Sequence, residues 1–290
     1  TPKYNGNSKL IEESPYRSPI LRNKDTLMVI NTVEEMGLLT NNYTKEATDF
    51  IKKNKKNPFF LYLAHNMPHV PIGASEKFRA KSEGGFYGDV IEELDWSMGE
   101  VLKTLKEEGL EENTLVIFVS DNGPWIEEKI GDHAGSAYPL KGSKAQTWEG
   151  GVRVPCIMQW KGQIKEGVTN TELLTTMDFF PTLIQYAGGN SSYNLPSKSI
   201  SFQFTNESQT SPRTMIWVRR EGHKFSGQDY YAISNGQYKL LQRNPFSEYE
   251  LFDLKFDYKE SQPIENVEMK NILQKQLTKH IQKSGSTPWQ

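Results

Sequence analysis

The stretch LVIFVSDNGPW, residues 115–125, decides the fold. Five apolar residues have the length and composition of a buried strand, and Gly123 and Pro124 then turn the chain. In open α/β sheets, ligands bind at the carboxyl ends of the strands. Asp121 and Asn122 stand at such an end, and they have two interpretations. They are ordinary turn formers, or they are hard oxygen ligands for a divalent cation such as Ca²⁺.

A second apolar run, PFFLYLAH at residues 58–65, also has the length of a strand. A helix is predicted from Thr44 to Lys53 before it, and a longer one within residues 86–109 after it. Strand, helix and strand with fully apolar strands is typical of a parallel sheet covered by helices. We therefore predict an α/β fold with a mostly parallel sheet flanked by helices.

The longer helix has apolar residues at spacings of three and four, which predicts one buried face. Gly109 ends the run. The charged residues Glu92, Glu93 and Asp95 are predicted to lie on the solvent side. The predicted buried face consists of Ile91, Leu94, Met98, Leu102 and Leu105.

The pattern divides the chain into three parts. Residues 1–40 are polar and rich in turn formers, which indicates a connecting segment. Residues 41–190 carry the α/β pattern. Residues 191–290 contain short strand-like runs broken by turns, followed by a helix near Val267–Lys283, which predicts a small antiparallel subdomain.

Composition excludes several classes of protein. The chain has 290 residues, a formal net charge of −2 and mixed charge signs, which gives no electrostatic footprint for nucleic acid or an anionic membrane. No stretch reaches the roughly 18 apolar residues of a membrane span. The single cysteine, Cys156, lies in an apolar run and is expected to be a small buried hydrophobe.

Two further stretches carry residues with chemical potential. HNMPHVP, residues 65–71, places His65 and His69 directly after the apolar run. A long loop with several glycines, residues 131–155, carries His133, Lys141 and Lys144. Loops of this length without secondary structure are usually functional.

Taken in order, these stretches resemble the sulfatase family of the alkaline-phosphatase-like superfamily. The segments that carry the resemblance are SDNGP at residues 120–124, GSKAQTWEGGVRVP at 142–155 and ELFDLKFDYKES at 250–261. The resemblance runs from about Tyr43 to Glu260. It implies an alkaline-phosphatase-like fold and a sulfuric ester hydrolase, with calcium as the metal.

The resemblance also implies roles for single residues. Asp121 and Asn122 match two ligands of the calcium ion that holds the sulfate ester. His69 matches the histidine that contacts the sulfate and helps to protonate the leaving oxygen, and Lys144 matches the lysine that contacts a sulfate oxygen. These roles suit the chemistry, because negative charge accumulates on the bridging oxygen as the S–O bond breaks.

Other family motifs are not in this sequence. The family nucleophile is a formylglycine made from a C/S-x-P-x-R motif, with two metal aspartates before it and a Gly-Lys-x-x-His stretch after it. ESPYR, residues 13–17, has the Pro and Arg spacing but Glu13 at the nucleophile position, and we interpret it as a coincidence. We therefore expect the formylglycine segment upstream, an inactive isolated chain and weak calcium affinity.

The remaining site residues have open interpretations. His133 lines the substrate entrance or is a solvated loop histidine, and Lys141 is a second anion contact or an exposed lysine. In the C-terminal part, a subsite for an anionic sugar and a simple surface strand pair explain the same side chains equally well. These side chains are Trp217, Arg219, Arg220 and His223.

Two other functions stay open. One is a phosphonate or phosphate ester hydrolase of the same superfamily, and the other is a non-catalytic remnant that keeps the fold for binding. The expected substrate is a sulfated glycan or an aryl sulfate, without nucleic acid or membrane partners. Export to a periplasm, the medium or a lysosome is expected from the resemblance, and the sequence does not predict the oligomeric state.

Overall fold

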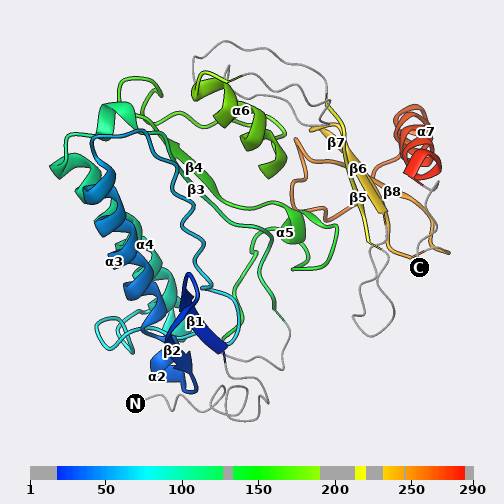
Figure 1. Cartoon of the computed structure of the whole chain (residues 1–290). Helices are drawn as coiled ribbons and strands as arrows, with labels where there is room; N and C mark the ends of the chain where they lie inside the picture. Colours follow the sequence, from blue (N-terminus) through cyan, green and yellow to red (C-terminus); the bar gives the residue numbers. More distant parts are fainter. Residues whose placement is uncertain (1–17, 127–132, 190–212, 220–230, 245, 285–290) are drawn as a thin grey trace. The chain divides into compact units, whose positions relative to one another are not determined.

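The computed structural model (Figure 1) describes residues 18–126, 133–189, 213–219, 231–244 and 246–284. The chain forms two compact units. The first consists of Thr1–Leu115 with Ile126–Gly135, and the second of Val116–Trp125 with Ser136–Gln290. The boundary predicted near residue 190 falls outside the described residues, so it stays a prediction.

The first unit begins with an antiparallel hairpin of β1 (Ser18–Arg22) and β2 (Asp25–Ile30), followed by the short helix α2 (Val33–Met36). Thr32 caps α2, because its side chain accepts a hydrogen bond from the backbone N–H of Glu35 and the Glu35 carboxylate accepts one in return. The second half of the segment predicted to be a connection therefore has its own local structure.

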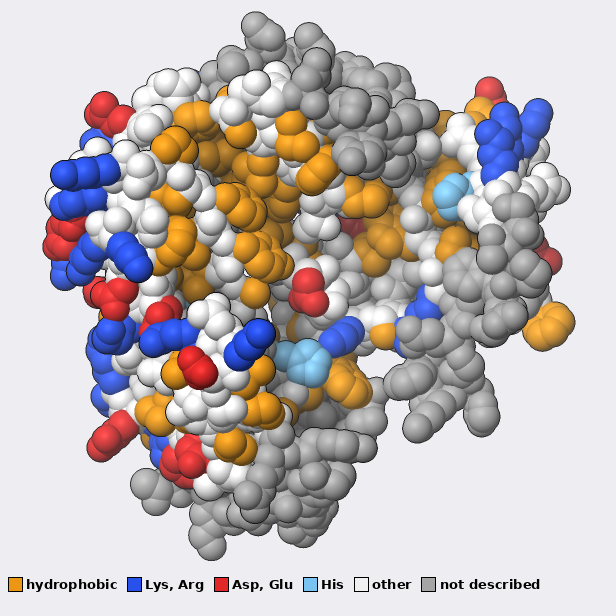
Figure 2. Space-filling view, viewed as in Figure 1, with side chains coloured by type: hydrophobic (Ala, Val, Ile, Leu, Met, Phe, Trp, Pro, Cys, Tyr) orange, Lys and Arg blue, Asp and Glu red, His pale blue; other side chains and the backbone are white. Residues whose placement is uncertain are grey.

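Two long helices, α3 (Leu39–Asn54) and α4 (Gly85–Glu107), pack side by side (Figure 1), and a 3-10 turn, η1 (Glu111–Asn113), follows them. Both predicted helices are confirmed, and α3 begins five residues before the predicted start. Acidic and basic side chains are interspersed over the outer face of this helix pair (Figure 2).

The buried face of α4 differs from the predicted one. Ile91 is exposed, whereas Glu93 is buried and accepts a hydrogen bond of 2.8 Å from the backbone N–H of Ser75. A buried carboxylate is tolerated where such a donor is available, so an acidic residue can occupy the core stripe. The buried hydrophobic cluster of this unit consists of Met67, Ile72, Ala74, Val90 and Leu94.

Residues 58–65 belong to no helix or strand of the structure. Within the described residues, no backbone hydrogen bond joins this segment to another strand. Phe60 and Tyr62 on one side of it are 71% and 80% exposed. The strand predicted from the apolar pattern is therefore not formed in the described part of the chain, and the expected parallel pairing is not formed there either.

The second unit begins with β3 (Val116–Val119), which pairs antiparallel with β4 (Cys156–Gln159). The predicted strand is confirmed, although every pair among the described strands is antiparallel. Cys156 is exposed on β4, so the expected burial of its thiol is wrong. Ile157 and Gln159 of β4 are also exposed, and among the described strands β4 pairs with β3 alone.

Two helical segments follow, η3 (Thr176–Asp178) and α6 (Phe179–Tyr186). Asp178 is fully buried, and its two carboxylate oxygens accept hydrogen bonds of 2.5 and 2.8 Å from the Arg213 guanidinium. This bidentate pair ties the start of α6 to the segment before the C-terminal sheet.

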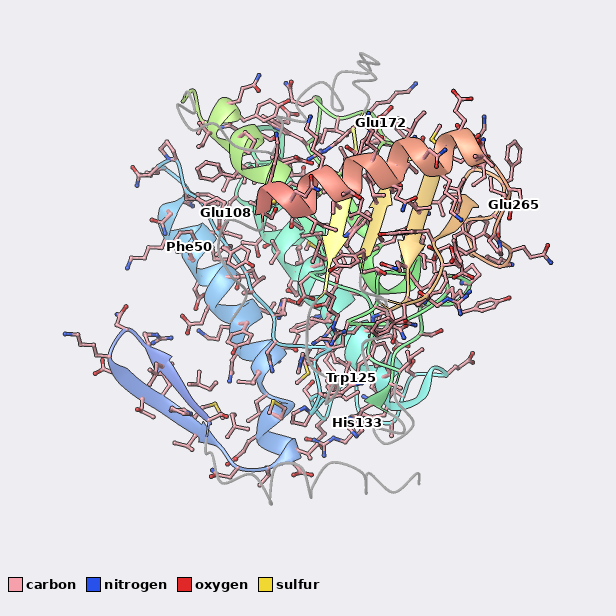
Figure 3. All side chains as sticks on the ribbon, turned by 90° about the vertical axis from the view of Figure 1, so that its right-hand side faces the viewer. Phe50, Glu108, Trp125, His133, Glu172 and Glu265 are labelled. Carbon is pink, nitrogen blue, oxygen red and sulfur yellow. The ribbon has the colours of Figure 1, made fainter. Side chains whose placement is uncertain are left out.

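The C-terminal sheet is antiparallel, with the order β5-β6-β7-β8, as the sequence predicted. A short turn of residues 235–237 joins its central strands, and Gly236 in this turn has a positive φ of 96°. Helix α7 (Val267–Ser284) lies across one face of the sheet (Figure 3). The strands are β5 (Met215–Val218), β6 (Tyr231–Ser234), β7 (Tyr238–Gln242) and β8 (Glu250–Asp253).

The alternation of side chains gives this sheet two apolar faces. Leu240 packs with Leu273 and Leu277 of α7, whereas the next residue, Leu241, packs on the opposite face with Trp148. Trp148 of the long loop thus packs on the sheet face that α7 leaves open. None of the described helices is long and apolar enough to cross a membrane.

Candidate functional site

Asp121 and Asn122 lie directly after β3, at its carboxyl end. The Asp121 carboxylate is exposed, and one of its oxygens accepts a hydrogen bond of 2.9 Å from the backbone N–H of Asn122. The Asn122 amide nitrogen donates to the Gly123 carbonyl at 3.0 Å, so its amide oxygen points the other way. The strand end therefore presents a carboxylate oxygen and an amide oxygen, both hard donors.

The long loop packs against this strand end without intervening side chains. The Gly123 N–H donates to the Gly151 carbonyl at 3.0 Å. A Cβ atom placed on Gly123 would lie 1.9 Å from the Gly150 carbonyl oxygen, so this contact requires glycine. Short helix α5 (Glu149–Val152) supplies both of these glycines.

Lys144 belongs to the same contact. Its backbone N–H donates to the Pro124 carbonyl at 2.8 Å, and its ammonium nitrogen lies 6.0 Å from the ring centroid of Trp125. Its side chain is half-buried. The second unit thus brings together two segments that the sequence separates by about twenty residues, the strand end and the lysine-bearing loop.

Lys141 is engaged within the fold. Its ammonium nitrogen lies 3.8 Å from the ring centroid of Trp148 and donates to the Glu260 carbonyl oxygen at 3.1 Å. The cation–π contact and the hydrogen bond hold the side chain against the C-terminal sheet. A contact between Lys141 and substrate stays a prediction, and this geometry gives the ammonium group a structural use.

His69 lies in the first unit, in a turn closed by its N–H on the Asn66 carbonyl at 3.0 Å. Its Nδ1 is 2.7 Å from the Val70 carbonyl oxygen, which accepts a hydrogen bond when Nδ1 carries the proton. This bond favours that tautomer and leaves Nε2 as the outward atom. The imidazole is exposed, so Nε2 is open to a ligand.

The two other histidines of interest also lie in the first unit. His133 is buried, and its ring meets the Phe86 ring edge-on at 4.7 Å between centroids (His133 is labelled in Figure 3). His65 is mostly buried and its Nε2 is 3.2 Å from the Ser97 hydroxyl, which in turn accepts from the Thr44 hydroxyl at 2.6 Å. Burial lowers the pKa of His65. This agrees with a structural role for His65.

The sugar subsite considered from the sequence stays a prediction, because the structure describes two of its four residues. Trp217 packs on the cluster around Trp148, and the Arg219 guanidinium donates to the Ala145 carbonyl of the long loop. Arg220 and His223 lie outside the described residues.

Sequence reasoning missed a cluster of buried charges beneath the long loop. The Lys239 ammonium lies 2.8 Å from a Glu149 carboxylate oxygen and 2.9 Å from one of Glu260. Lys239 and Glu260 are both fully buried. Burial raises the pKa of Glu260, and the nearby Lys239 ammonium lowers it in part. The available signal was a lysine inside the strand-like run QYKLLQ, whose neighbours are apolar.

The strand end fits part of a metal site. Asp121 and Asn122 supply two hard oxygen donors, whereas Ca²⁺ takes about six to eight oxygen ligands. Among the residues that the structure describes, no group of three or more His, Cys, Asp or Glu side chains could hold a metal ion. The two donors thus suit a calcium ion whose remaining ligands come from other groups.

The fold and the arrangement at the end of β3 indicate the class of protein. The described structure is that of an alkaline-phosphatase-like protein, as its structural neighbours show. The Sulfatase family model matches residues 1–189, and the chain therefore belongs to the sulfatase family. A second model, N-sulphoglucosamine sulphohydrolase, C-terminal, matches residues 143–286.

Curated relatives agree with this assignment. The chain is 43% identical over 153 residues to human (Homo sapiens) steryl-sulfatase. The matched region is 52% of this chain and 26% of that protein. It is 41% identical over 152 residues to mouse (Mus musculus) N-acetylgalactosamine-6-sulfatase. Here the matched region is 52% of this chain and 29% of that protein. The matches therefore span less than a third of the length of these relatives.

Solved structures extend the likeness over nearly the whole chain. The crystal structure of Ps i-CgsB in complex with k-i-k-neocarrahexaose superposes with a TM-score of 0.75 and 26% identity, covering 91% of this chain and 57% of that one. The PsFucS1 sulfatase from Pseudoalteromonas sp. gives a TM-score of 0.74 and 26% identity, covering 90% and 55%. The chain thus spans somewhat more than half of these structures.

Proposed function

We propose that the whole protein hydrolyses sulfate esters and that this chain supplies part of its active site. Membership of the sulfatase family supports the reaction. The substrate class is a sulfated glycan or an aryl sulfate. The glycan is favoured by the relative named N-acetylgalactosamine-6-sulfatase and by the structural neighbour bound to a hexaose.

The observation that carries this proposal is the direct contact between the strand end and the long loop. The Gly123 N–H donates to the Gly151 carbonyl and the Lys144 N–H to the Pro124 carbonyl, so backbone hydrogen bonds join the segment with both oxygen donors to the segment with Lys144. A sulfate monoester needs a metal and fixed cations around its oxygens as the S–O bond breaks.

Each residue then has a defined task. Lys144 contacts a sulfate oxygen and stabilises the charge that develops on the sulfuryl group. In its doubly protonated form, the His69 imidazolium donates the Nε2 proton to the leaving oxygen, while its Nδ1–H stays hydrogen-bonded to the Val70 carbonyl. His133 and Lys141 are secondary candidates for substrate contact.

The metal in this proposal is calcium, with Asp121 and Asn122 as two of its ligands. A bound calcium ion would offset the negative charge of the sulfate ester. The nucleophile is a formylglycine from a segment outside the sequence printed here, which contains no C/S-x-P-x-R motif. The 290-residue chain by itself is therefore expected to be inactive and to bind calcium weakly.

The first experiment is to sequence the coding region upstream of Thr1. The proposal expects an open frame with paired aspartates, then C/S-x-P-x-R, then Gly-Lys-x-x-His. The protein from that frame is then assayed with 4-nitrophenyl sulfate and a sulfated oligosaccharide in the presence of Ca²⁺. A start codon close to Thr1, without these motifs, would contradict the enzyme proposal and favour the non-catalytic remnant.

Variants test the roles in the same assay. Lys144→Ala is expected to lower kcat/KM for sulfate esters by about a hundredfold or more. Lys165→Ala, an exposed lysine of the same unit, is the matched control and should leave kcat/KM unchanged. Phosphate and phosphonate monoesters are assayed in parallel, and faster turnover of either would favour the alternative hydrolase. Export from the cell, as in our sequence-based expectation, is tested by fractionation.

A further inference from the structure

The buried ionic cluster of Glu149, Lys239 and Glu260 joins three segments that are distant in the sequence. Lys239 lies in β7, Glu149 begins α5 in the long loop, and Glu260 follows β8. The Lys239 ammonium bridges the two carboxylates at 2.8 and 2.9 Å. All three side chains are at most one-tenth exposed.

Glu260 holds the long loop at two points. Its carboxylate accepts a hydrogen bond of 2.7 Å from the Glu149 N–H, and its backbone carbonyl accepts one of 3.1 Å from the Lys141 ammonium. Its own backbone has a positive φ of 54°, which is unfavourable for a residue with a side chain. These contacts fix the two ends of the segment 141–149.

The fixed segment carries Lys144. From this segment the backbone bonds to Pro124, and from α5 the Gly151 carbonyl accepts from Gly123. A chain of contacts therefore runs from the ionic cluster through the loop to the strand end that holds Asp121 and Asn122.

Packing alone does not account for the cluster. Leu241 lies on the same sheet face as Lys239, and it already packs against Trp148 of the loop. Burying three charges is costly, and apolar side chains of similar volume often stabilise such a site as well or better. The gain from charged groups is directional, because each bond fixes the orientation of a loop atom.

We propose that Lys239 and Glu260 are positioning residues, which hold the loop 141–151 so that Lys144 and the strand end keep one mutual geometry. The link to catalysis rests on the proposed function, whereas the positioning of the loop does not. The two parts therefore need separate measurements.

The first measurement is amide hydrogen exchange on the 290-residue chain, read by mass spectrometry. Lys239→Met removes the bridge, and Glu260→Gln is a milder variant that keeps the shape and an acceptor for the Glu149 N–H. Peptides covering residues 141–151 are expected to exchange about tenfold faster or more in both variants. In Glu260→Gln, the milder variant, peptides from β6, β7 and α7 should retain the protection seen in the unaltered chain.

The matched control is Arg213→Met, which breaks the other buried ion pair of the same unit, with Asp178. It should leave exchange of residues 141–151 unchanged. The proposal is overturned if both cluster variants leave the loop unaffected. It is equally overturned if Glu260→Gln loosens the sheet and α7 as much as the loop, because the cluster would then only hold the subdomain together.

The second measurement is a double-variant cycle in the active whole protein. If the cluster acts through Lys144, Glu260→Gln should lower kcat/KM for a sulfate ester about tenfold in the unaltered protein and have little effect in a Lys144→Ala background. Additive losses would overturn the link through Lys144. If the whole protein shows no sulfate ester hydrolysis, the proposed function fails, and the exchange experiment still decides the positioning of the loop.

Discussion

The two units hold their candidate residues by opposite means. In the first unit, His69 is fixed by its immediate neighbours, a turn to Asn66 and the carbonyl of Val70, and its ring is exposed. In the second unit, Lys144 is fixed by contacts from distant parts of the chain, through Gly150, Gly151 and the buried ionic cluster. The difference indicates where stability and function can be separated: at the locally held residue, and not at the long-range one.

The largest expected effect comes from Lys239→Met. It leaves the Glu149 and Glu260 carboxylates buried without their common cation, which costs about 3–5 kcal/mol of unfolding free energy. Urea denaturation followed by circular dichroism measures it. The comparison is Lys103→Met in α4, an exposed i,i+4 partner of Glu107, which should leave the denaturation midpoint unchanged. Equal midpoints for both variants would show that the cluster contributes nothing to the second unit.

Gly150→Ala tests the backbone contact directly. A Cβ there would lie 2.5 Å from the Lys141 carbonyl oxygen and 2.7 Å from that of Gly142, so we expect a loss of about 1–3 kcal/mol from overpacking. Gly99→Ala in α4 is the matched glycine, because no atom lies within 4 Å of its added Cβ. It should raise the unfolding free energy by about 0.5–1 kcal/mol. The thermal unfolding midpoint should therefore fall in Gly150→Ala and rise in Gly99→Ala.

The pH dependence of the unfolding free energy tests the role of His65 in the first unit. Burial lowers the pKa of His65 in the folded state below its unfolded value of 6.5, so folding favours the neutral ring. Its contribution is complete above pH 6.5 and is lost as the pH falls through the lowered folded pKa. His65→Gln should therefore flatten the decline of unfolding free energy on the acidic side of pH 6.5. An identical slope in variant and unaltered protein would contradict this assignment.

The smallest effect on stability is expected from His69→Ala. The ring is exposed and bonded only to the adjacent carbonyl among the described contacts, so the unfolding free energy should change by at most about 0.5 kcal/mol. In the active whole protein, the same variant should lower kcat by about a hundredfold or more through loss of the proton donor. A large loss of stability together with the loss of activity would remove the contrast between the two units.

The sequence predicted the elements that depend on local pattern. The amphipathic periods of α3, α4 and α7 and the alternation in the C-terminal sheet were sufficient for their type and approximate bounds. The run at residues 58–65 was predicted as a strand because periodicity reports an extended, apolar backbone and does not report whether a ladder partner is present. The prediction that Glu93 faces solvent was wrong for a similar reason, since the hydrogen-bond donor that allows its burial, the Ser75 N–H, is eighteen residues away.

The sequence predicted the segments of the candidate site as motifs, and the roles of their residues stay predictions. The motifs around Asp121, Asn122 and Lys144 were recognisable in the sequence, and the structure brings their segments together within one unit. Lys239 and Glu260 were not found, because their importance lies in a contact between β7, the long loop and the residue after β8. Glu149 is 90 residues from Lys239 and 111 residues from Glu260. No spacing pattern in the sequence predicts that such distant segments meet.

The unpaired segment at residues 58–65 has a practical consequence for handling the protein. Its backbone has no ladder partner in the described structure, and Phe60 and Tyr62 project from it into solvent. Unpaired backbone groups beside exposed aromatic side chains favour association between chains. Preparations of this 290-residue chain should therefore self-associate with rising concentration, and a charged residue at position 60 or 62 should improve solubility without touching the candidate site.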